Sequence, residues 1–245
     1  MAGHSKWANI KRRKGAQDIK RGKVFGKLIR EITVAARMGD PDPEMNPRLR
    51  LAVDKAKANS MPKDNIERAI AKASGEGGGE SYDQITYEGY GPGGVAILVQ
   101  CLTDNRNRTA SEIRHAFSKE GGNMGQAGSV AYLFQRKGLF NLPKEDLDEE
   151  TVLMAALEGS GEDVSEEEDE WQVTAAFEDY FSCMKALEEL GVEVASDVTQ
   201  IPDNEVAISG EDARKLVKLL DRLEDLDDVQ ETWTNADINE ADLED

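Results

Sequence analysis

The sequence is poor in the residues from which metal and redox centres are built. Its 245 residues include only two histidines and two cysteines. His4 and His115 are far apart, and Cys101 and Cys183 lie in separate apolar stretches without the spacing of a zinc site. The sequence therefore predicts buried free thiols in a reducing cytoplasm, with no metal and no cofactor.

Long hydrophobic runs are also missing. No stretch approaches the roughly 18 apolar residues that cross a membrane, and the charged N-terminus is not followed by the apolar segment of a secretory signal. The hydrophobic content of 39% and charged content of 32% are better suited to several small domains than to one large core. We expect a cytoplasmic protein with no membrane contact and no small-molecule substrate.

Positive charge is scarce overall and concentrated at one end. The chain has 30 Lys and Arg against 49 Asp and Glu, a net charge of −19. Residues 1–30 hold ten basic side chains and one acid, Asp18, a net of +9, whereas residues 75–245 carry −29. Such asymmetry indicates contact with a polyanion such as nucleic acid. A solvated face, a flexible tail or a localisation signal is the alternative explanation.

The basic run supplies the candidate nucleic-acid-binding residues. Over residues 16–38, apolar side chains recur at helical spacing, and lysines and arginines fall on the opposite side of the helix. An aromatic ring within the run adds a stacking surface. The candidates are Lys6, Trp7, Lys11, Arg12, Arg13, Lys14, Lys20, Arg21, Lys23, Lys27 and Arg30.

Three helices are predicted before the first glycine-rich stretch. The first covers residues 16–38, the second begins at Asn46-Pro47, and the third follows Pro62. Their small apolar faces predict a basic helical domain at residues 1–75, and the glycine-rich residues 76–80 predict a linker.

The periodicity then changes to that of a second, α/β domain. Its predicted elements are strands at 82–90, 95–102 and 129–134, and a helix at 109–119 with a capping box at Thr109. A strand, a helix and a strand at 205–208, 211–226 and 229–234 are expected to complete its sheet. The glycine-rich residues 89–94 lack the spacing of a phosphate-binding loop and predict a hairpin turn.

Residues 136–202 have the order β-α-β-β-α-β, which is the ferredoxin-like split unit. This unit is expected to be inserted into a second domain formed by residues 81–135 and 203–236, and residues 237–245 form an acidic tail. The predicted fold is α+β with three domains: an N-terminal helical bundle and two α/β domains, the third ferredoxin-like and inserted in the second.

A polar loop at residues 104–109 contains two more candidate residues, Arg106 and Arg108. Two guanidinium groups and the N–H groups of a helix N-terminus suit an anion such as phosphate. The alternative is a capped loop whose arginines pair with nearby acids. The composition of the loop fits both.

Four motifs carry a resemblance to a known family. They are residues 2–11 (AGHSKWANIK), 87–94 (YEGYGPGG), 104–109 (DNRNRT) and 128–134 (GSVAYLF). On these motifs the chain resembles, over essentially its whole length, the YebC/PmpR family. That family includes bacterial proteins described as transcriptional regulators and the mitochondrial translational activator of cytochrome c oxidase. The resemblance implies the same three domains and no catalytic residues. Many members have histidine where this chain has Arg12, a change that adds charge.

The leading hypothesis is a cytoplasmic nucleic-acid-binding regulator of gene expression that binds duplex DNA and controls transcription. Its alternative is a ribosome-associated translation factor that binds ribosomal RNA or tRNA; the resemblance adds relief of stalling at proline-rich stretches. Two further classes of protein are an enzyme and an adaptor. An enzyme is disfavoured because no nucleophile or acid–base pair stands at a recognisable spacing. An adaptor whose acidic domains bind basic proteins, such as ribosomal proteins, is compatible with the leading hypothesis.

Overall fold

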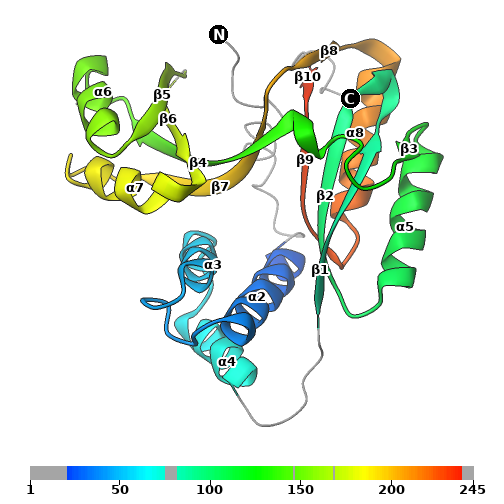
Figure 1. The fold of residues 1–245 in the computed structure, drawn as a ribbon, viewed down its shortest axis with the longest axis horizontal. Coiled ribbons are helices and arrows are strands. Elements are labelled where there is room, and N and C mark those ends of the chain that lie inside the picture. Colours follow the sequence, from blue (N-terminus) through cyan, green and yellow to red (C-terminus); the bar gives the residue numbers. More distant parts are fainter. Residues whose placement is uncertain (1–20, 75–81, 146, 168, 239–245) are drawn as a thin grey trace. The chain divides into compact units, whose positions relative to one another are not determined.

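Three amphipathic helices form the described part of the N-terminal domain (Figure 1). The computed structural model describes residues 21–74, 82–145, 147–167 and 169–238. Helix α2 (Arg21–Met38) ends where the sequence predicts, and α3 (Pro47–Ala58) and α4 (Lys63–Ser74) follow it. Their apolar faces meet in one core, which includes the fully buried side chains of Ile32 and Leu49. The remaining predicted residues of the first helix, 16–20, lie outside the described residues.

Asn46 fixes the turn between α2 and α3. Its side-chain oxygen accepts the N–H of Leu49 at 3.1 Å, as an N-cap residue does, and Pro47 follows at the first helical position. Its amide group donates to the carbonyls of Ala35 and Asp40, both at 2.8 Å. The N-cap predicted at this position is confirmed, and the same side chain also ties the two helices together.

The second domain is an antiparallel sheet covered by two helices. Strands β1 (Asp83–Tyr90), β2 (Ala96–Thr103) and β9 (Val229–Thr234) pair in the order β3-β1-β2-β9, with the short β3 (Asn123–Met124) at one edge. Helices α5 (Arg106–Lys119) and α8 (Gly210–Glu224) pack apolar side chains on the sheet and form its core with β2. The strand predicted at 229–234 therefore does join the sheet begun at β1.

A separate four-stranded unit lies between the two parts of this domain in sequence. Contacts group residues Phe134–Asp203 into one compact unit, distinct from the other described residues. Its elements, in chain order, are β4 (Phe134–Pro143), α6 (Glu149–Glu158), β5 (Gly161–Glu166), β6 (Glu170–Ala176), α7 (Tyr180–Glu188) and β7 (Ala195–Pro202). The strand order β5-β6-β4-β7, all antiparallel, is the ferredoxin-like arrangement. The predicted α+β class with an inserted ferredoxin-like domain is confirmed.

Three local predictions are wrong. Residues 129–134 were expected to form a strand, but Ala131–Leu133 form a single turn of 3₁₀ helix. Strand β8 (Val206–Ile208) does not enter the main sheet; it pairs in parallel with β10 (Ala236–Ile238), which extends into the predicted acidic tail. Helix α5 begins at Arg106, capped by Asn105, so Thr109 lies inside the helix and caps nothing. The first two errors concern partners that are distant in sequence, whereas the third concerns a local cap at Asn105.

None of the described helices is both long enough and apolar enough to cross a membrane.

Candidate nucleic-acid interface

The predicted binding residues divide into those that the structure describes and those that it does not. Arg21 is the first residue of α2. Five more candidates have described side chains: Lys23, Lys27, Arg30, Arg106 and Arg108. The candidates outside the described residues are Lys6, Trp7, Lys11, Arg12, Arg13, Lys14 and Lys20.

Lys23, Lys27 and Arg30 form a cation row along one side of α2. The spacing of four and then three residues places them on the same helical face, away from the apolar core. The Lys23 ammonium lies 3.2 Å from a carboxylate oxygen of Asp225, and the Lys27 ammonium donates to the Glu224 carbonyl at 2.7 Å. The sequence places this row on an open surface, and that expectation is wrong in part because the row contacts the turn after α8.

The partners of the cation row are the carbonyls and carboxylates at the C-terminal end of α8. The last carbonyls of a helix lack intrahelical partners and carry the negative end of the helix dipole. Arg30 donates to the carbonyl of Asp227 at 2.6 Å, in the turn that follows. Basic side chains from one helix thus cap the end of another, which explains why the row gathers there.

A hollow of about 320 Å³ opens beside this contact. It is lined by Gly22, Lys23, Gly26, Lys27, Arg30 and Asp227. The two glycines stand one helical turn apart, and a Cβ atom at either position would meet nothing within 4 Å. The absence of their side chains leaves the backbone of α2 accessible between the cations. Lys23 is half exposed, with 51% of its side chain accessible. Three basic side chains and one acidic side chain, Asp227, therefore line the hollow.

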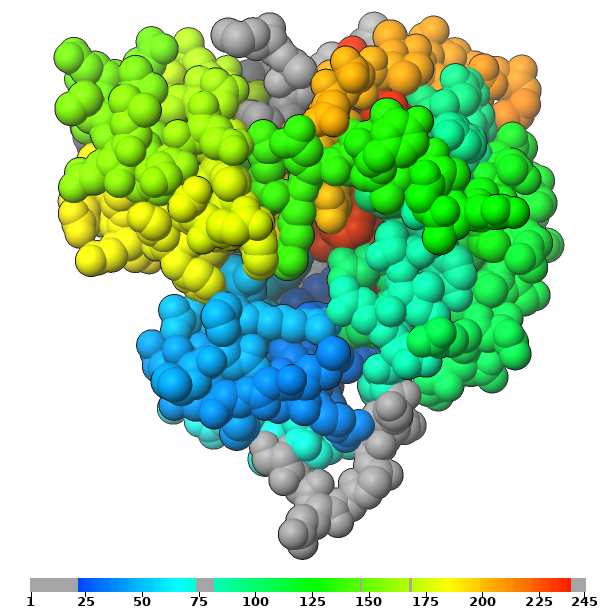
Figure 2. Space-filling model, in the orientation of Figure 1, coloured from blue at the N-terminus to red at the C-terminus, as the bar shows by residue number. Residues whose placement is uncertain are grey.

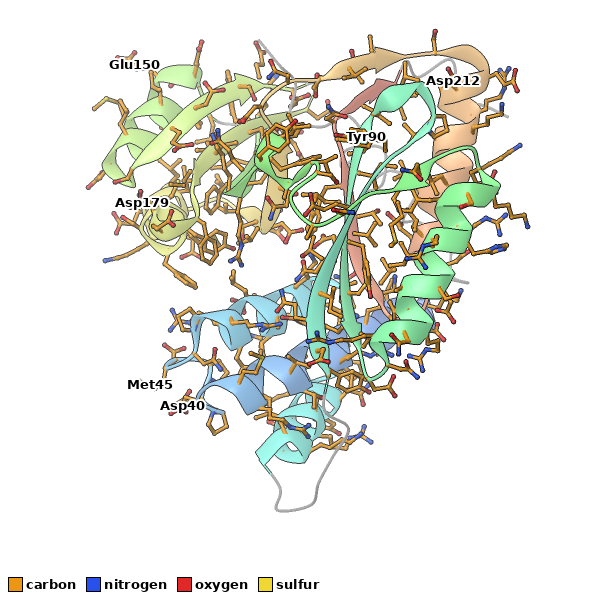
Figure 3. The ribbon with its side chains drawn as sticks, turned by 45° about the vertical axis from the view of Figure 1, so that its right-hand side comes forward. Asp40, Met45, Tyr90, Glu150, Asp179 and Asp212 are labelled. Carbon is orange, nitrogen blue, oxygen red and sulfur yellow. The ribbon has the colours of Figure 1, made fainter. Side chains whose placement is uncertain are left out.

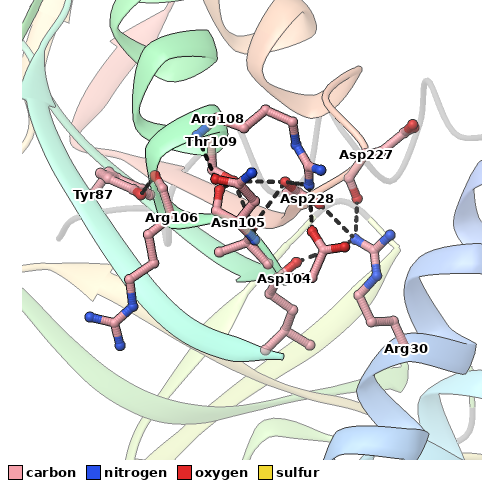
Figure 4. A network of polar contacts seen from close by, with 11 residues as sticks. Arg30, Tyr87, Asp104, Asn105, Arg106, Arg108, Thr109, Asp227 and Asp228 are labelled. Carbon is pink, nitrogen blue, oxygen red and sulfur yellow. Dashed lines mark hydrogen bonds and ion pairs between the residues drawn. The ribbon is translucent and has the colours of Figure 1, made fainter. Parts of the chain in front are cut away.

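Asp228 is the centre of a polar network beneath the cation row (Figure 4). The residue is only 4% exposed. One of its carboxylate oxygens accepts from the Arg108 guanidinium at 2.6 Å and from the hydroxyls of Thr109 at 2.7 Å and Thr103 at 3.1 Å. Its other carboxylate oxygen lies 3.5 Å from the guanidinium of Arg30. One buried acid therefore joins α2, β2, α5 and the start of β9.

Hydrogen bonding keeps this acid ionised despite its burial. Burial alone raises the pKa of Asp228, but the hydrogen bonds from Arg108 and Thr109 and the charge of Arg108 outweigh it, so the net shift is downward. The same hydrogen bond to Asp228, with a second to Asp104, raises the pKa of Arg108. The pair is therefore charged throughout the physiological range.

The two arginines of residues 104–109 are both paired with acids. Arg106 contacts Asp83 at 2.7 Å, and Arg108 contacts Asp104 at 2.8 Å in addition to Asp228. One of the first N–H groups of α5 is also taken, because the Asn105 side chain accepts the N–H of Arg108 at 3.1 Å. Of the two arrangements expected for residues 104–109, an anion site or a capped loop, the structure has the capped loop, with both arginines paired with acids.

A second buried acid joins two of the recognised motifs. The Glu88 carboxylate accepts the backbone N–H groups of Gly128, Val130 and Ala131 at 2.6, 2.7 and 2.8 Å. Burial raises its pKa, and these three bonds lower it by more, so the net shift is downward. The motif at residues 87–94 therefore supplies the carboxylate, Glu88, that holds the backbone turn formed by the motif at residues 128–134.

Few groups elsewhere suggest chemistry. No three metal-ligating side chains cluster among the described residues. Cys101 and Cys183 are free and buried, as predicted. Burial, with nearby Asp228, raises the pKa of the Cys101 thiol to about 12, and burial raises that of Cys183 to about 11. Neither thiol is therefore a nucleophile at neutral pH.

Sequence reasoning did not find Asp228 or Glu88. Asp228 stands in a run of acids that reads as solvated surface, and its partners Thr103 and Arg108 are about 120 residues away. Glu88 could have been suspected because it lies between alternating apolar strand residues and precedes Gly89. At Gly89, an added Cβ would lie 2.7 Å from both the Asn123 carbonyl oxygen and the Phe117 ring.

Fold and site together define a three-domain α+β protein with a cationic first described helix and a ferredoxin-like insertion. The model of the "TACO1/YebC protein N-terminal domain" matches residues 5–76, and the model of the "TACO1/YebC second and third domain" matches residues 82–236. The chain belongs to this family.

Several proteins are similar to this chain over nearly its whole length. A "probable transcriptional regulatory protein" of Geobacter sulfurreducens is 54% identical over 245 residues, covering 100% of this chain and 99% of the relative. One from Idiomarina loihiensis, with the same description, is 54% identical over 242 residues, covering 98% and 97%. The crystal structure of a conserved hypothetical protein from Aquifex aeolicus, 49% identical, aligns with a TM-score of 0.81 over 91% of this chain and 93% of the other.

Proposed function

We propose that this protein regulates gene expression by binding nucleic acid, as a cytoplasmic transcriptional regulator that binds duplex DNA. Relatives that are about half identical over the full chain are named probable transcriptional regulatory proteins, which supports the regulatory role. The observation that carries the binding role is the hollow on α2, where Lys23, Lys27 and Arg30 converge. No catalytic role is proposed, because no described group has the partners of a nucleophile or an acid–base pair.

The proposed contact is made to phosphates. A phosphate at the hollow would accept hydrogen bonds from the ammonium groups of Lys23 and Lys27, in competition with Asp225 and the Glu224 carbonyl. The basic residues of segment 1–20, which lie outside the described residues, are proposed to add further phosphate contacts. The geometry of the described helices includes no helix-turn-helix pair aimed at a groove, so we expect affinity from the backbone and weak base preference.

The test compares two labelled ligands of equal length and charge. Fluorescence anisotropy is measured with a 24-base-pair DNA duplex and with a 24-base-pair RNA hairpin stem, from 50 to 300 mM salt. The proposal predicts binding to the duplex DNA and a linear fall of log affinity with log salt. The matched variants are Lys27→Gln, which removes a lining cation, and Lys72→Gln, which removes an exposed cation on α4.

The outcomes separate the alternatives. Weaker binding with a smaller salt slope in Lys27→Gln, and no change in Lys72→Gln, would support the proposed surface. A strong preference for the RNA stem, together with co-sedimentation on ribosomes, would replace the transcriptional role by the translational one. Absence of binding to both ligands at about 100 mM salt, where a contact of this charge should persist, would reject the proposal altogether.

A further inference from the structure

Helix α6 of the inserted domain is apolar on the face that meets solvent. Its inward side chains, Val152, Ala155 and Ala156, are buried and pack the domain core. Outside, Leu153 is 43%, Met154 65% and Leu157 62% exposed. A helix that is apolar all round is ordinarily buried on all sides. The outer side chains of α6 therefore have a role other than packing their own domain.

A groove accompanies these side chains. Helices α6 and α7 pack against each other, and their side chains meet on one face of the inserted domain (Figure 2). The groove between them has a volume of about 680 Å³. Its apolar surface comes from Met154, Ala155 and Leu157 of α6 with Ala186 and Leu190 at the end of α7. The volume is in the range of sites that bury several side chains of a partner.

The rim of the groove is uniformly acidic. Asp148, Glu150, Glu158 and Glu189 line it, together with Thr151, and no lysine or arginine is among the lining residues. Figure 3 shows Glu150 at one end of α6, where its carboxylate points into solvent. A partner that covers the apolar floor must therefore bring positive charge to the rim.

Two of these acids oppose the stability of their own helices. Glu158 is the last residue of α6, and Glu189 is the C-cap of α7. A negative charge at a helix C-terminus meets the negative end of the helix dipole and is unfavourable. Asp148, in contrast, is a favourable N-cap that accepts the Thr151 N–H at 2.7 Å. Lys185 in the last turn of α7 offsets part of the charge of Glu189, whereas the last turn of α6 holds no basic residue to offset Glu158. A cationic partner would compensate Glu158 most.

We propose that the α6–α7 groove binds a cationic amphipathic segment of another protein. The segment would insert apolar side chains, spaced three to four residues apart, over Met154 and Leu157, and place lysines or arginines beside Glu150, Glu158 and Glu189. This function is additional to nucleic-acid binding, because an acidic rim repels phosphates. The protein would thus bind a nucleic acid through its N-terminal domain and a basic protein through its inserted domain.

The test uses the full chain and two synthetic probes. One is a 14-residue helical peptide of leucine and lysine with apolar residues on one face, and the other has every lysine replaced by glutamate. Binding is followed by fluorescence polarisation and by the methyl NMR signal of Met154, assigned with Met154→Leu. We expect the lysine peptide to bind and shift this signal, and the glutamate peptide to do neither.

Three variants identify the site. Met154→Gln/Leu157→Gln should lower the affinity for the lysine peptide at least about tenfold, which is the effect of losing one strong apolar anchor. Glu150→Lys/Glu158→Lys/Glu189→Lys should exchange the preference, so that the glutamate peptide binds and the lysine peptide does not. The control Glu145→Lys/Glu178→Lys/Glu193→Lys makes the same charge change at exposed acids outside the groove lining and should keep the original preference.

Other results overturn the proposal. Equal peptide binding by the wild type and Met154→Gln/Leu157→Gln would mean that general acidity, not the groove, attracts the peptide. Self-association that disappears in the same variant, measured by sedimentation, would assign the groove to a second copy of the chain. Tighter binding of a peptide of residues 1–20 than of the lysine peptide would assign it to the chain's own basic segment. DNA affinity is measured on the same samples. If the peptides do not bind, the DNA titration still tests the proposed nucleic-acid binding independently.

Discussion

Breaking the Lys23–Asp225 ion pair from its two sides should change nucleic-acid affinity in opposite directions. Lys23→Gln and Asp225→Asn both abolish the contact at 3.2 Å, whose side chains are 51% and 64% exposed. An exposed pair of this kind contributes at most about 1 kcal/mol to the free energy of unfolding. Both variants therefore stay folded and lose the ion pair. Lys23→Gln also loses an exposed hydrogen bond to the Asp225 carbonyl at 3.3 Å, and the main difference between the variants is the charge left behind.

The size of each effect follows from the charge that remains. Lys23→Gln removes one phosphate contact, which reduces the salt slope by about 0.9 and the affinity by about eightfold at 0.1 M salt. Asp225→Asn removes a carboxylate about 6 Å from a phosphate held by Lys23, a repulsion of roughly 0.7 kcal/mol in solvent, so affinity should rise about threefold. Anisotropy titrations of a labelled DNA duplex at several salt concentrations measure both quantities.

The reasoning would be refuted if both variants weakened binding equally, since the ion pair would then serve only to hold the two domains together. A matched pair on α4 provides the control. Lys63 and Glu67 lie 3.4 Å apart, with side chains 85% and 61% exposed. Lys63→Gln and Glu67→Gln make the same charge changes away from the hollow, and we expect affinity to change by less than about twofold, within the effect of a single unpaired surface charge.

Three other perturbations test the buried groups. Asp228→Ala should lower the free energy of unfolding by about 3 kcal/mol in denaturant titrations, because it leaves a buried charge network without its acid, whereas Asp104→Ala should cost less than about 1 kcal/mol. Because the pKa of Glu88 is lowered on folding, its contribution to stability is present above its ordinary value of 4.5 and is lost as pH falls below that value. Thermal melts should therefore show a Tm deficit for Glu88→Gln at pH 7 that narrows below pH 4.5. Since burial raises the thiol pKa of Cys101 to about 12 and of Cys183 to about 11, neither should react with a disulfide reagent at about pH 8 until the chain is unfolded.

The fold could be predicted wherever a pattern is local. The inserted domain follows from its succession of short strands and helices, and even the weak strand near Val164 forms within β5. The end of α2 at Met38 and the Asn46 cap follow from turn residues that act on their immediate neighbours. These signals need no knowledge of distant partners, because helix caps and periodic faces are encoded within a few residues.

Apart from the start of α5, where a local cap at Asn105 was missed, the errors concern pairings between distant segments. Residues 129–134 have the apolar alternation of a strand, but the Glu88 carboxylate, 40 residues earlier, binds the N–H groups of Gly128 and Val130 and forces a turn. Strand β8 finds its partner in β10, across α8 and β9. The position of Glu88 in its strand marks it as unusual, but neither the turn that it binds nor the parallel pair can be recognised from local composition, since both depend on the folded sheet.

Charge counting located the candidate surface but not its partners. It identified Lys23, Lys27 and Arg30 as a row on one face of a helix, and the structure places all three at one hollow. It made no prediction for the acids at residues 224–228, whereas they and their carbonyls contact that row. A net charge counted over the sequence cannot distinguish acids that repel a nucleic acid from acids that hold the basic side chains that would bind it.

The acidic turn after α8 therefore decides how strongly the cation row can bind. It holds Arg30 most firmly, since that side chain is only 21% exposed, donates to Asp227 and stacks at 5.2 Å over the Tyr82 ring. Lys23 has only an exposed carboxylate and a backbone carbonyl at 3.2 and 3.3 Å. Under the proposed function, a phosphate would compete with Asp225 for Lys23 at little cost, whereas the partners of Arg30 are more buried and would cost more to replace. Arg30 thus positions α2, and Lys23 is the residue through which a polyanion would first be bound.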